Sequence, residues 1–552
     1  MDDVVQLRTV TPGDITMDHF LDIASSRFSY RSRLKVLFLG LSLLLLPPLP
    51  VKKQGASGDG QPTPHDKLSA GENGRQRITF VHVSDIHARY NPDKDGASFL
   101  GRIRGYYERA KNENPFTLLT NAGDDYEKGS VAEELSRGQT SREVTMAMRY
   151  DVRTLGNHDF AWGLEEFLRF SSDPSATVVA SNTSMTPGSG HSSVWPAPGW
   201  TDFSIKTLGK IRIGFFGMVS RPWDERNTQY DGQFYPKVRA LKTDFDFMGR
   251  ARDIIARHRQ EVDLLVLLSH LGIEDDCALA AGTQGIDLIL GGHSHTTMEE
   301  PLRVNDTTII HAGAFAETFG RYDIEYDVAR KVIAGSSYRL VVNRPGDIPE
   351  DPRTSGKIAE ILKKYQSAIG EPIARIGQDQ DEQAMALIAA RAAVDTMKID
   401  AALIGMDSVG DRWSRGQLTS QDVLNAFRVE RQPAGTPGQT SLYLVTVRGA
   451  DLLHANAVSS DFVFYGPKAI HPGLLYTVAM QKNQAFHQKD CFGRIIGVSR
   501  PRPAAEIWET VVAYARTCNE GGLALDEDPR KLKDENLVAL LQYGNSALET
   551  VQ

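Results

Sequence analysis

The stretch Ile286-Asp287-Leu288-Ile289-Leu290-Gly291-Gly292-His293-Ser294-His295 joins an apolar run to two glycines and two histidines. The apolar run predicts a buried strand, and the polar residues follow at its carboxyl end. Layered α/β folds build their sites at this edge of the sheet, because loops that leave neighbouring strands converge there. The stretch therefore predicts an α/β fold with a site that contains His293 and His295.

Four more segments of the chain carry the same kinds of polar residue. They are Asp85-Ile86-His87, Gly123-Asp124-Asp125, Gly156-Asn157-His158-Asp159 and Ser269-His270-Leu271. Apolar runs at residues 78–83, 116–120 and 262–268 precede three of them. Each segment alone is weak evidence, because Asp-x-His or Gly-Asn-His-Asp is also ordinary turn chemistry. Together they predict a cluster of Asp, Asn and His side chains at one sheet edge.

These side chains suit paired divalent metal ions. Carboxylate oxygens, an amide oxygen and imidazole nitrogens are common ligands of divalent transition ions, and no thiolate cluster competes for the role. We therefore interpret the set as a two-metal hydrolase centre. His82 and His311 lie within apolar runs and are predicted to be core residues, and His191 lies in a Gly/Ser-rich stretch that predicts a loop.

In order, spacing and flanking residues, the five segments resemble the metallophosphoesterase superfamily, and in particular the two-domain 5'-nucleotidase family. The resemblance implies a four-layer α/β/β/α metallophosphoesterase domain followed by a smaller α/β 5'-nucleotidase-type C-terminal domain. It also implies two divalent metal ions, and leaves their identity open among Mn, Zn, Fe or similar metals. The implied ligands are Asp85, His87, Asp124 and His295 for one ion, and Asp124, Asn157, His270 and His293 for the other.

His158 stays off the metals in this resemblance and is expected to be catalytic. Metal-activated water would attack phosphorus, and His158 would stabilise the phosphoryl oxygens or protonate the leaving alkoxide. The family commonly places an acid three residues after this histidine, but Ala161 stands there. Asp159 is the nearest carboxylate and the second catalytic candidate. Whether Asp159, Asp125 or another acid orients the imidazole stays open.

Length and composition describe an ordinary soluble multidomain protein. The chain has 552 residues, of which 41% are hydrophobic and 24% charged, and a net charge of −8, which argues against a nucleic-acid polymer as partner. Proline, glycine and charge patterns divide it into a lead (1–75), a catalytic domain (76–345), a linker helix (346–370) and a divergent C-terminal substrate domain (371–552).

The lead contains a segment, residues 34–50, that resembles a signal or anchor sequence. Basic residues at 31–35 precede an apolar run at 36–46, which prolines close, and a flexible tether follows. We expect export, with the folded part periplasmic, extracellular or tethered to a membrane and facing outward. The alternative is an apolar stretch within a disordered tail.

The C-terminal domain departs from the nucleotidase pattern where specificity would be set. Residues 418–427 and 443–453 resemble the family, but the Asn-Gly-Gly-Gly-Ile-Arg element corresponds here to residues 405–410 and ends in Gly410. Arg412 is the candidate substrate-binding residue in its place, and Val429 stands where the family stacks a phenylalanine on the base. Other aromatic candidates are Tyr476, Phe486 and Phe492.

The combined evidence predicts a metal-dependent phosphoester hydrolase that acts on a small phosphorylated substrate, possibly a nucleotide. The alternatives are a phosphodiesterase or a nucleotide-sugar or sugar-phosphate hydrolase, and, from another class, a metal-containing binding protein with little activity. Cys491 and Cys518 could form a disulfide in an exported protein or be free thiols, like Cys277. The oligomeric state stays open.

Overall fold

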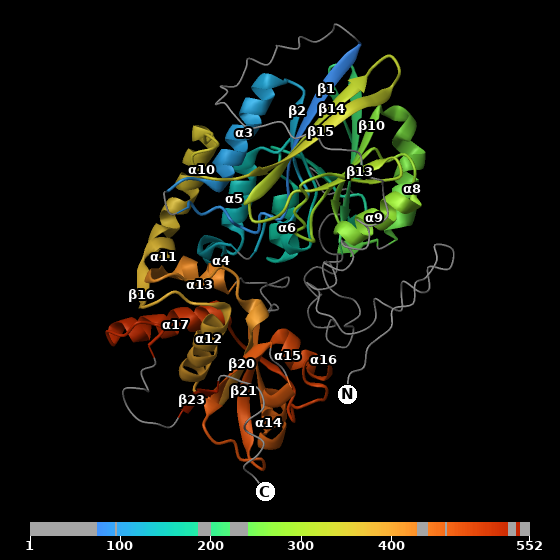
Figure 1. The fold of residues 1–552 in the computed structure, drawn as a ribbon. Coiled ribbons are helices and arrows are strands. Elements are labelled where there is room, and N and C mark those ends of the chain that lie inside the picture. The colour runs from blue at the N-terminus through green and yellow to red at the C-terminus, as the bar shows by residue number, and fades with distance from the viewer. Residues whose placement is uncertain are drawn as a thin grey trace, which may run out of the picture. The chain divides into compact units, whose positions relative to one another are not determined.

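A computed structural model describes residues 74–93, 96–127, 129–185, 200–220, 241–244, 246–427, 440–458, 461–527 and 537–540 (Figure 1). The predicted lead up to residue 73, His191 and Val429 lie outside these residues. Among the described helices, none combines the length and the apolar character that a membrane span requires.

The first sheet of the catalytic region has seven strands in the order β15-β14-β1-β2-β3-β4-β6. Five strands run parallel, and the β14–β15 hairpin pairs antiparallel with the β1 edge. The strands are β1 (Arg75–Val83), β2 (Thr117–Asn121), β3 (Val152–Arg153), β4 (Thr177–Val179), β6 (Trp200–Thr201), β14 (Thr318–Asp327) and β15 (Val332–Val342).

The second sheet has six strands in the order β12-β13-β11-β10-β8-β7. Its four central strands are parallel, and the two edge strands pair antiparallel. The strands are β7 (Ser204–Leu208), β8 (Ile211–Val219), β10 (Leu264–His270), β11 (Leu288–Gly291), β12 (Leu302–Val304) and β13 (Thr307–His311); β5 (Thr183–Met185) and β9 (Leu241–Thr243) form a separate pair.

Alternate residues along each strand face two different cores, which makes the catalytic region a four-layer structure. On β10, Val266 faces a core between the sheets, whereas Leu265 and Leu267 face helices α8 (Phe247–His258) and α9 (Ile273–Gly282). On β1, Phe80 faces the inter-sheet core and Val81 faces the other helix layer. That layer contains α3 (Phe99–Glu113), α5 (Gln139–Met148) and α10 (Pro352–Leu362) (Figure 1). The predicted α/β/β/α class is confirmed.

Two shorter helices lie near the site: α4 (Val131–Ser136) and α6 (Leu164–Ser171). The predicted linker helix consists of α10, a 3-10 turn at Lys363–Tyr365, and α11 (Gln366–Gly370). Ile358 and Ile361 of α10 join the core under α3, so this helix packs on the catalytic layer. The domain boundaries at 76–345, 346–370 and 371–552 stay predictions.

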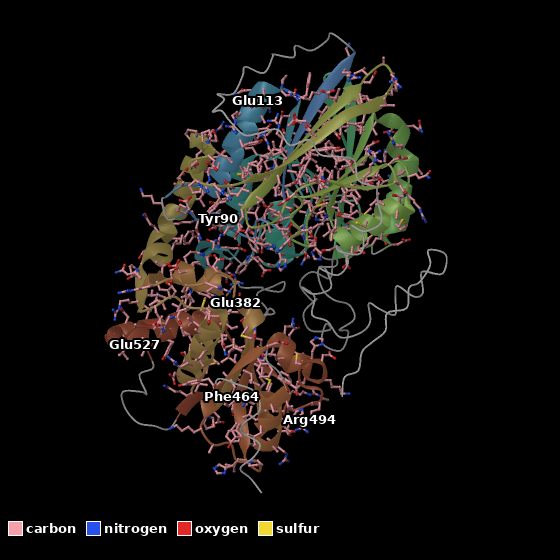
Figure 2. The ribbon with its side chains drawn as sticks, viewed as in Figure 1. Tyr90, Glu113, Glu382, Phe464, Arg494 and Glu527 are labelled. Atoms are coloured by element: carbon pink, nitrogen blue, oxygen red, sulfur yellow. The ribbon has the colours of Figure 1, made fainter. Side chains whose placement is uncertain are left out.

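The C-terminal region is a second, smaller α/β structure. Its six-stranded sheet has the order β22-β19-β21-β17-β20-β23, with helices on both faces. Phe464, labelled in Figure 2, fills one of the two cores. The strands are β17 (Ala401–Gly405), β19 (Ser441–Arg448), β20 (Phe462–Pro467), β21 (Leu475–Gln481), β22 (Arg502–Glu506) and β23 (Leu537–Leu540), and a separate pair is β16 (Pro372–Ile376) with β18 (Gly416–Thr419).

Helices on one face of this sheet are α12 (Glu382–Met397), α13 (Ser420–Ala426) and α17 (Ile507–Glu520). The other face carries α14 (Gly449–Val458), α15 (Lys482–Phe486) and α16 (Gln488–Phe492). All three cysteines are free thiols, so the structure does not form the disulfide between Cys491 and Cys518 that the sequence left open.

His82 connects the two sheets. It is 1% exposed on β1; its Nδ1 lies 3.1 Å from the Thr120 hydroxyl and its Nε2 lies 3.2 Å from the Gly291 carbonyl of β11. A carbonyl only accepts, so Nε2–H donates to it. His311 is equally buried and pairs with Asp276 at 2.8 Å. Both histidines are core residues, as predicted.

Burial lowers the pKa of His82 to about 3. Below pH about 6.5 the imidazole of His82 therefore binds a proton in the unfolded chain but stays neutral in the folded protein. This difference lowers the free energy of unfolding as the pH falls from about 6.5 toward about 3. We predict that His82→Gln reduces the loss of unfolding free energy between pH about 7.5 and about 5 by roughly 2 kcal/mol. Urea unfolding of both proteins in chelator measures this. An equal loss in both would contradict it.

Candidate metal centre

The carboxyl ends of parallel strands from both sheets deliver the predicted ligands. In the first sheet, the segment of Asp85 and His87 follows β1, Asp124 follows β2 and Asn157 follows β3. In the second sheet, His270 ends β10, and His293 and His295 follow β11. The structure brings all seven predicted ligands together at this edge.

The ligands form two groups. The first is Asp85, His87 and His295, and the second is Asp124, His270 and His293; within each group the potential ligand atoms lie within 4.8 Å of one another. Asp124 Oδ2 lies 3.0 Å from His270 Nε2 and 3.7 Å from His87 Nε2. One carboxylate oxygen therefore lies between the groups, at the position of a bridging ligand.

Asn157 belongs to the second group. Its Oδ1 lies 2.9 Å from His293 Nδ1 and 3.2 Å from His270 Nε2. The sequence analysis missed Ser220, whose hydroxyl donates to the same oxygen at 3.2 Å. Ser220 directly follows β8, a central parallel strand, so its position matches that of the predicted ligands, but serine is not among the residue types that the sequence analysis selected.

Hydrogen bonds behind two of the histidines fix which ring nitrogen faces the centre. His87 Nδ1 lies 3.2 Å from the Tyr126 carbonyl and His270 Nδ1 lies 2.7 Å from the Ala122 carbonyl. These carbonyls accept Nδ1–H, so both Nε2 lone pairs face inward. His87 Nε2 lies only 3.0 Å from His295 Nε2. Acceptors thus converge on each group, which fits divalent cations.

Charge at the centre favours a cation. Although burial opposes ionisation, His270 and His158 hold the pKa of Asp124 well below its usual range. Burial likewise favours a neutral His270, but the Asp124 carboxylate raises the pKa of that ring to about 9. An ionised carboxylate buried among imidazoles attracts positive charge, and a metal ion competes with the proton for the same lone pairs.

The backbone at the centre adopts an uncommon conformation. Asp85, His87, Asp124, His293 and His295 all have φ between 49° and 74°. Non-glycine residues avoid this left-handed region unless the surrounding structure enforces it, and such residues concentrate at functional sites. A Cβ at Gly156 would lie 2.0 Å from Asp124 Oδ1, which explains the glycine before Asn157.

His158 lies beside the two groups and belongs to neither. Its backbone N–H donates to Asp124 Oδ1 at 2.8 Å, and its ring centroid lies 5.0 Å from that of His87. The side chain is 17% exposed, and its Nδ1 contacts the buried carboxylate of Glu127. Sequence reasoning missed Glu127, which lies three residues after Asp124 on the loop that follows β2.

Asp159 makes different contacts from those expected of an orienting acid. Its carboxylate accepts the backbone N–H groups of Gly156 at 2.7 Å, Asp125 at 2.9 Å and Asp124 at 3.2 Å. These bonds join the loops after β2 and β3. The contacts favour a structural role for Asp159, whereas Glu127 takes the place beside His158. Asp125 accepts a hydrogen bond from Asn121 at 2.9 Å.

The C-terminal candidate Arg412 is 63% exposed and lies 3.3 Å from Glu382.

Phe315, which the sequence analysis did not select, packs against the first ligand group. Its ring centroid lies 5.3 Å from that of His87 and 5.1 Å from that of His295, and its N–H donates to the Asp85 carbonyl at 2.7 Å.

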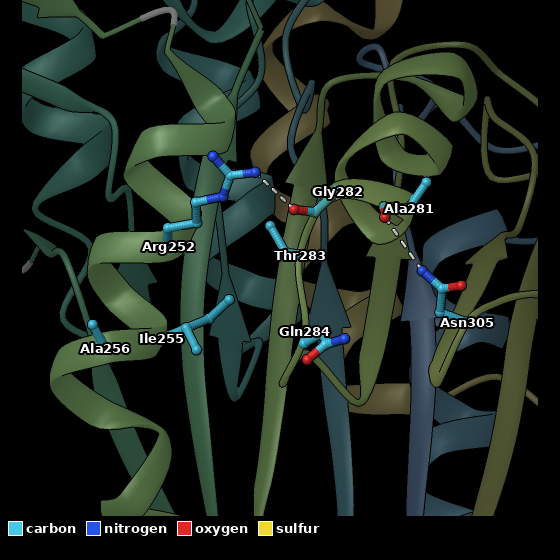
Figure 3. A pocket seen from close by; sticks show the side chains of 8 residues that line it. All are labelled: Arg252, Ile255, Ala256, Ala281, Gly282, Thr283, Gln284 and Asn305. Atoms are coloured by element: carbon cyan, nitrogen blue, oxygen red, sulfur yellow. Dashed lines mark hydrogen bonds between the residues drawn. The ribbon is translucent and has the colours of Figure 1, made fainter.

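A cavity of about 410 Å³ lies elsewhere, between α8, the end of α9 and the turn before β13 (Figure 3). Arg252 donates to the Gly282 carbonyl at 3.0 Å, and Asn305 donates to the Ala281 carbonyl at 3.3 Å. Gln284 precedes β11, so it lies toward the amino end of a strand whose carboxyl end leads to His293 and His295. The cavity is separate from the metal centre.

Comparisons with known proteins agree with this fold. Residues 78–297 match the family model of calcineurin-like phosphoesterases. Human 5'-nucleotidase is 24% identical over 320 residues, which cover 52% of each chain. The chain spans about half the length of the first curated relatives it matches.

Solved structures extend the likeness beyond the matched domain. The 5'-nucleotidase precursor of Thermus thermophilus has a TM-score of 0.60 at 17% identity, over 80% of this chain and 96% of that one. The sulfate thiohydrolase SoxB of the same organism has a TM-score of 0.58 at 17% identity, over 80% and 94%. Residues 78–297 therefore resemble calcineurin-like phosphoesterases, and most of the chain shares its fold with these two solved structures.

We predict that Asp124→Asn loses bound metal, because an amide has no anionic oxygen to balance two cations. The matched control is Asp125→Asn, since burial and the nearby Asp159 raise the pKa of Asp125 to about 8 and an amide resembles the protonated acid. Metal content after dialysis is the measurement. Two ions retained by Asp124→Asn at wild-type affinity would contradict the bridging position.

Proposed function

We propose that this protein is a phosphoester hydrolase that depends on two divalent metal ions. The observation that carries the proposal is the pair of ligand groups on either side of one Asp124 oxygen. Ions bound there would lower the pKa of water and polarise the phosphoryl oxygens of a substrate. The match of residues 78–297 to the family model of calcineurin-like phosphoesterases supports the same reaction class.

His158 acts on the substrate in this proposal. Its Nδ1 contacts Glu127, and its second nitrogen would stabilise phosphoryl oxygens or protonate the leaving alkoxide. Asp159 contributes by holding the loops that carry Asp124 and His158, as its three backbone hydrogen bonds suggest.

The substrate is a small phosphate ester that need not be a nucleotide. Gly410 has no side chain to grip a substrate, and its N–H donates to the Ala426 carbonyl at 2.7 Å. Arg412, the alternative substrate-binding residue, is exposed and forms an ion pair with Glu382. Human 5'-nucleotidase and the apyrase of Tabanus yao are relatives by sequence, so a nucleotide stays within the proposed class. A binding protein with little activity is the competing proposal.

A panel of phosphomonoesters and phosphodiesters with Mn²⁺ tests the function. We expect hydrolysis of a chromogenic monoester, and kcat/KM for AMP within about a hundredfold of that for glycerol phosphate, because Gly410 and Val429 stand at sequence positions where the nucleotidase family would supply a charged and an aromatic contact of about 1–3 kcal/mol each. A thousandfold preference for AMP would show that other residues rebuild a nucleotide pocket. Metal-loaded protein inactive on every ester would favour the binding protein.

Export remains part of the proposal, based on the basic and apolar segments at residues 31–35 and 36–46. A reporter enzyme that works only outside the cytoplasm, fused after residue 75, should be active. Deletion of residues 36–46 should abolish that activity. A reporter that works only in the cytosol gives the complementary readout, and its activity in the full-length fusion would overturn the proposal.

A further inference from the structure

We propose that Glu127 is the positioning residue of His158 and forms with it a carboxylate–histidine pair that spans two loops. The inference rests on the proposed phosphoester hydrolysis and deepens it. Glu127 follows β2, whereas His158 begins the 3-10 turn His158–Phe160 after β3. The pair is therefore made by the fold and not by neighbouring positions in the sequence.

The contact defines the state of the ring. Glu127 is fully buried and its Oε2 contacts His158 Nδ1. A carboxylate accepts, so Nδ1 carries the proton, and in the proposed reaction the second ring nitrogen acts on the substrate. The same contact restrains rotation of the imidazole and so aims that nitrogen.

The chain offers no acid within the His158 turn for this purpose. Ala161 is buried, its N–H donates to the His158 carbonyl at 3.0 Å, and its methyl group cannot pair with an imidazole. Asp159 is committed to three backbone N–H groups. Glu127 contacts the ring.

A second buried acid, Glu133 at the start of α4, holds Glu127 in place. Both Glu133 oxygens accept the Glu127 N–H, at 2.9 and 3.0 Å. This bond stabilises the backbone of Glu127 at φ 66°, a conformation that non-glycine residues rarely adopt. Glu133 also accepts the Trp162 indole N–H at 2.6 Å. Because Trp162 directly follows Ala161, Glu133 ties the loop of Glu127 to the turn of His158.

The support continues into the helix layer. Ser141 of α5 donates to Glu133 at 2.7 Å, and its hydroxyl lies 3.1 Å from the hydroxyl of Tyr90, a buried residue labelled in Figure 2. Each acceptor oxygen of Glu133 is thus bonded to groups from different segments. A side chain supported in this way fixes its neighbours, and such supporting contacts set how well a reactive group is aimed.

A double-mutant cycle tests whether Glu127 acts through His158. On a phosphomonoester with an alkyl leaving group, we expect His158→Ala to lower kcat by about 10²–10⁴-fold and Glu127→Gln by about 10–100-fold. The double variant should be no slower than His158→Ala alone, because the positioning residue then has nothing to position. Metal content should stay at the wild-type level in all three.

Two further comparisons separate positioning from general damage. A nitrophenyl ester, whose leaving group needs little protonation, should show smaller losses in both single variants if His158 is the acid. Glu143→Gln removes an exposed carboxylate of α5 that pairs with Gln139 and should leave kcat unchanged. If Glu127→Gln slows the His158→Ala protein by the same factor as it slows the wild type, the positioning role is wrong.

A spectroscopic readout works without any activity. In zinc-loaded protein with ¹⁵N-labelled histidine, the Nδ1–H proton of His158 should give a downfield resonance that disappears in His158→Ala and shifts or is lost in Glu127→Gln. An unchanged resonance in Glu127→Gln would refute the contact. If no ester is hydrolysed but the resonance responds to Glu127→Gln, the pair stands and the proposed function fails.

Discussion

The arrangement of the centre depends on the contacts that the Asp124 carboxylate makes. Its Oδ2 lies near histidines from both ligand groups, and its Oδ1 accepts the backbone N–H of His158. One side chain thus connects the two ligand groups with the side chain proposed to act on the substrate. Because it is buried, its charge is tolerable only with positive groups around it, and the histidines and the expected cations supply them.

The pKa values of two acids near Asp124 show that burial here disfavours an ionised carboxylate. Burial, with help from Asp159, raises the pKa of Asp125 to about 8, and burial raises the pKa of Glu133 to about 7. Glu133 accepts hydrogen bonds from Glu127, Ser141 and Trp162, whereas Asp125 accepts one from Asn121. Such networks hold loops in one geometry but leave little tolerance for loss of a single partner. The loops of the centre are therefore fixed by polar contacts more than by apolar packing.

Six of the seven predicted ligands follow a simple rule in the sequence, in which Asp or His comes after an apolar run that ends a parallel strand; Asn157 does not, because β3 before it is Val152–Arg153. The same runs predicted an α/β fold, and the family resemblance implied its four layers. Glu127 could not be found this way, since its contact with His158 joins residues 31 apart across two loops. For the same reason Asp159, although adjacent in sequence, lies among backbone N–H groups and not against the imidazole. Asp159 was the candidate because it is adjacent to His158 in the sequence, whereas the geometry of the loops makes Glu127 the residue that contacts the imidazole.

The hydrogen bond from His82 to the Gly291 carbonyl joins β1 to β11, two strands of different sheets whose following loops both carry predicted ligands. This bond helps to fix the distance between the two sheets near the centre. Each ligand group combines residues from both sheets, so the distances within each group depend on the inter-sheet core. A change in core volume that moves one sheet relative to the other would alter those distances directly. Apolar packing between the sheets thus influences the geometry in which the predicted ligands meet.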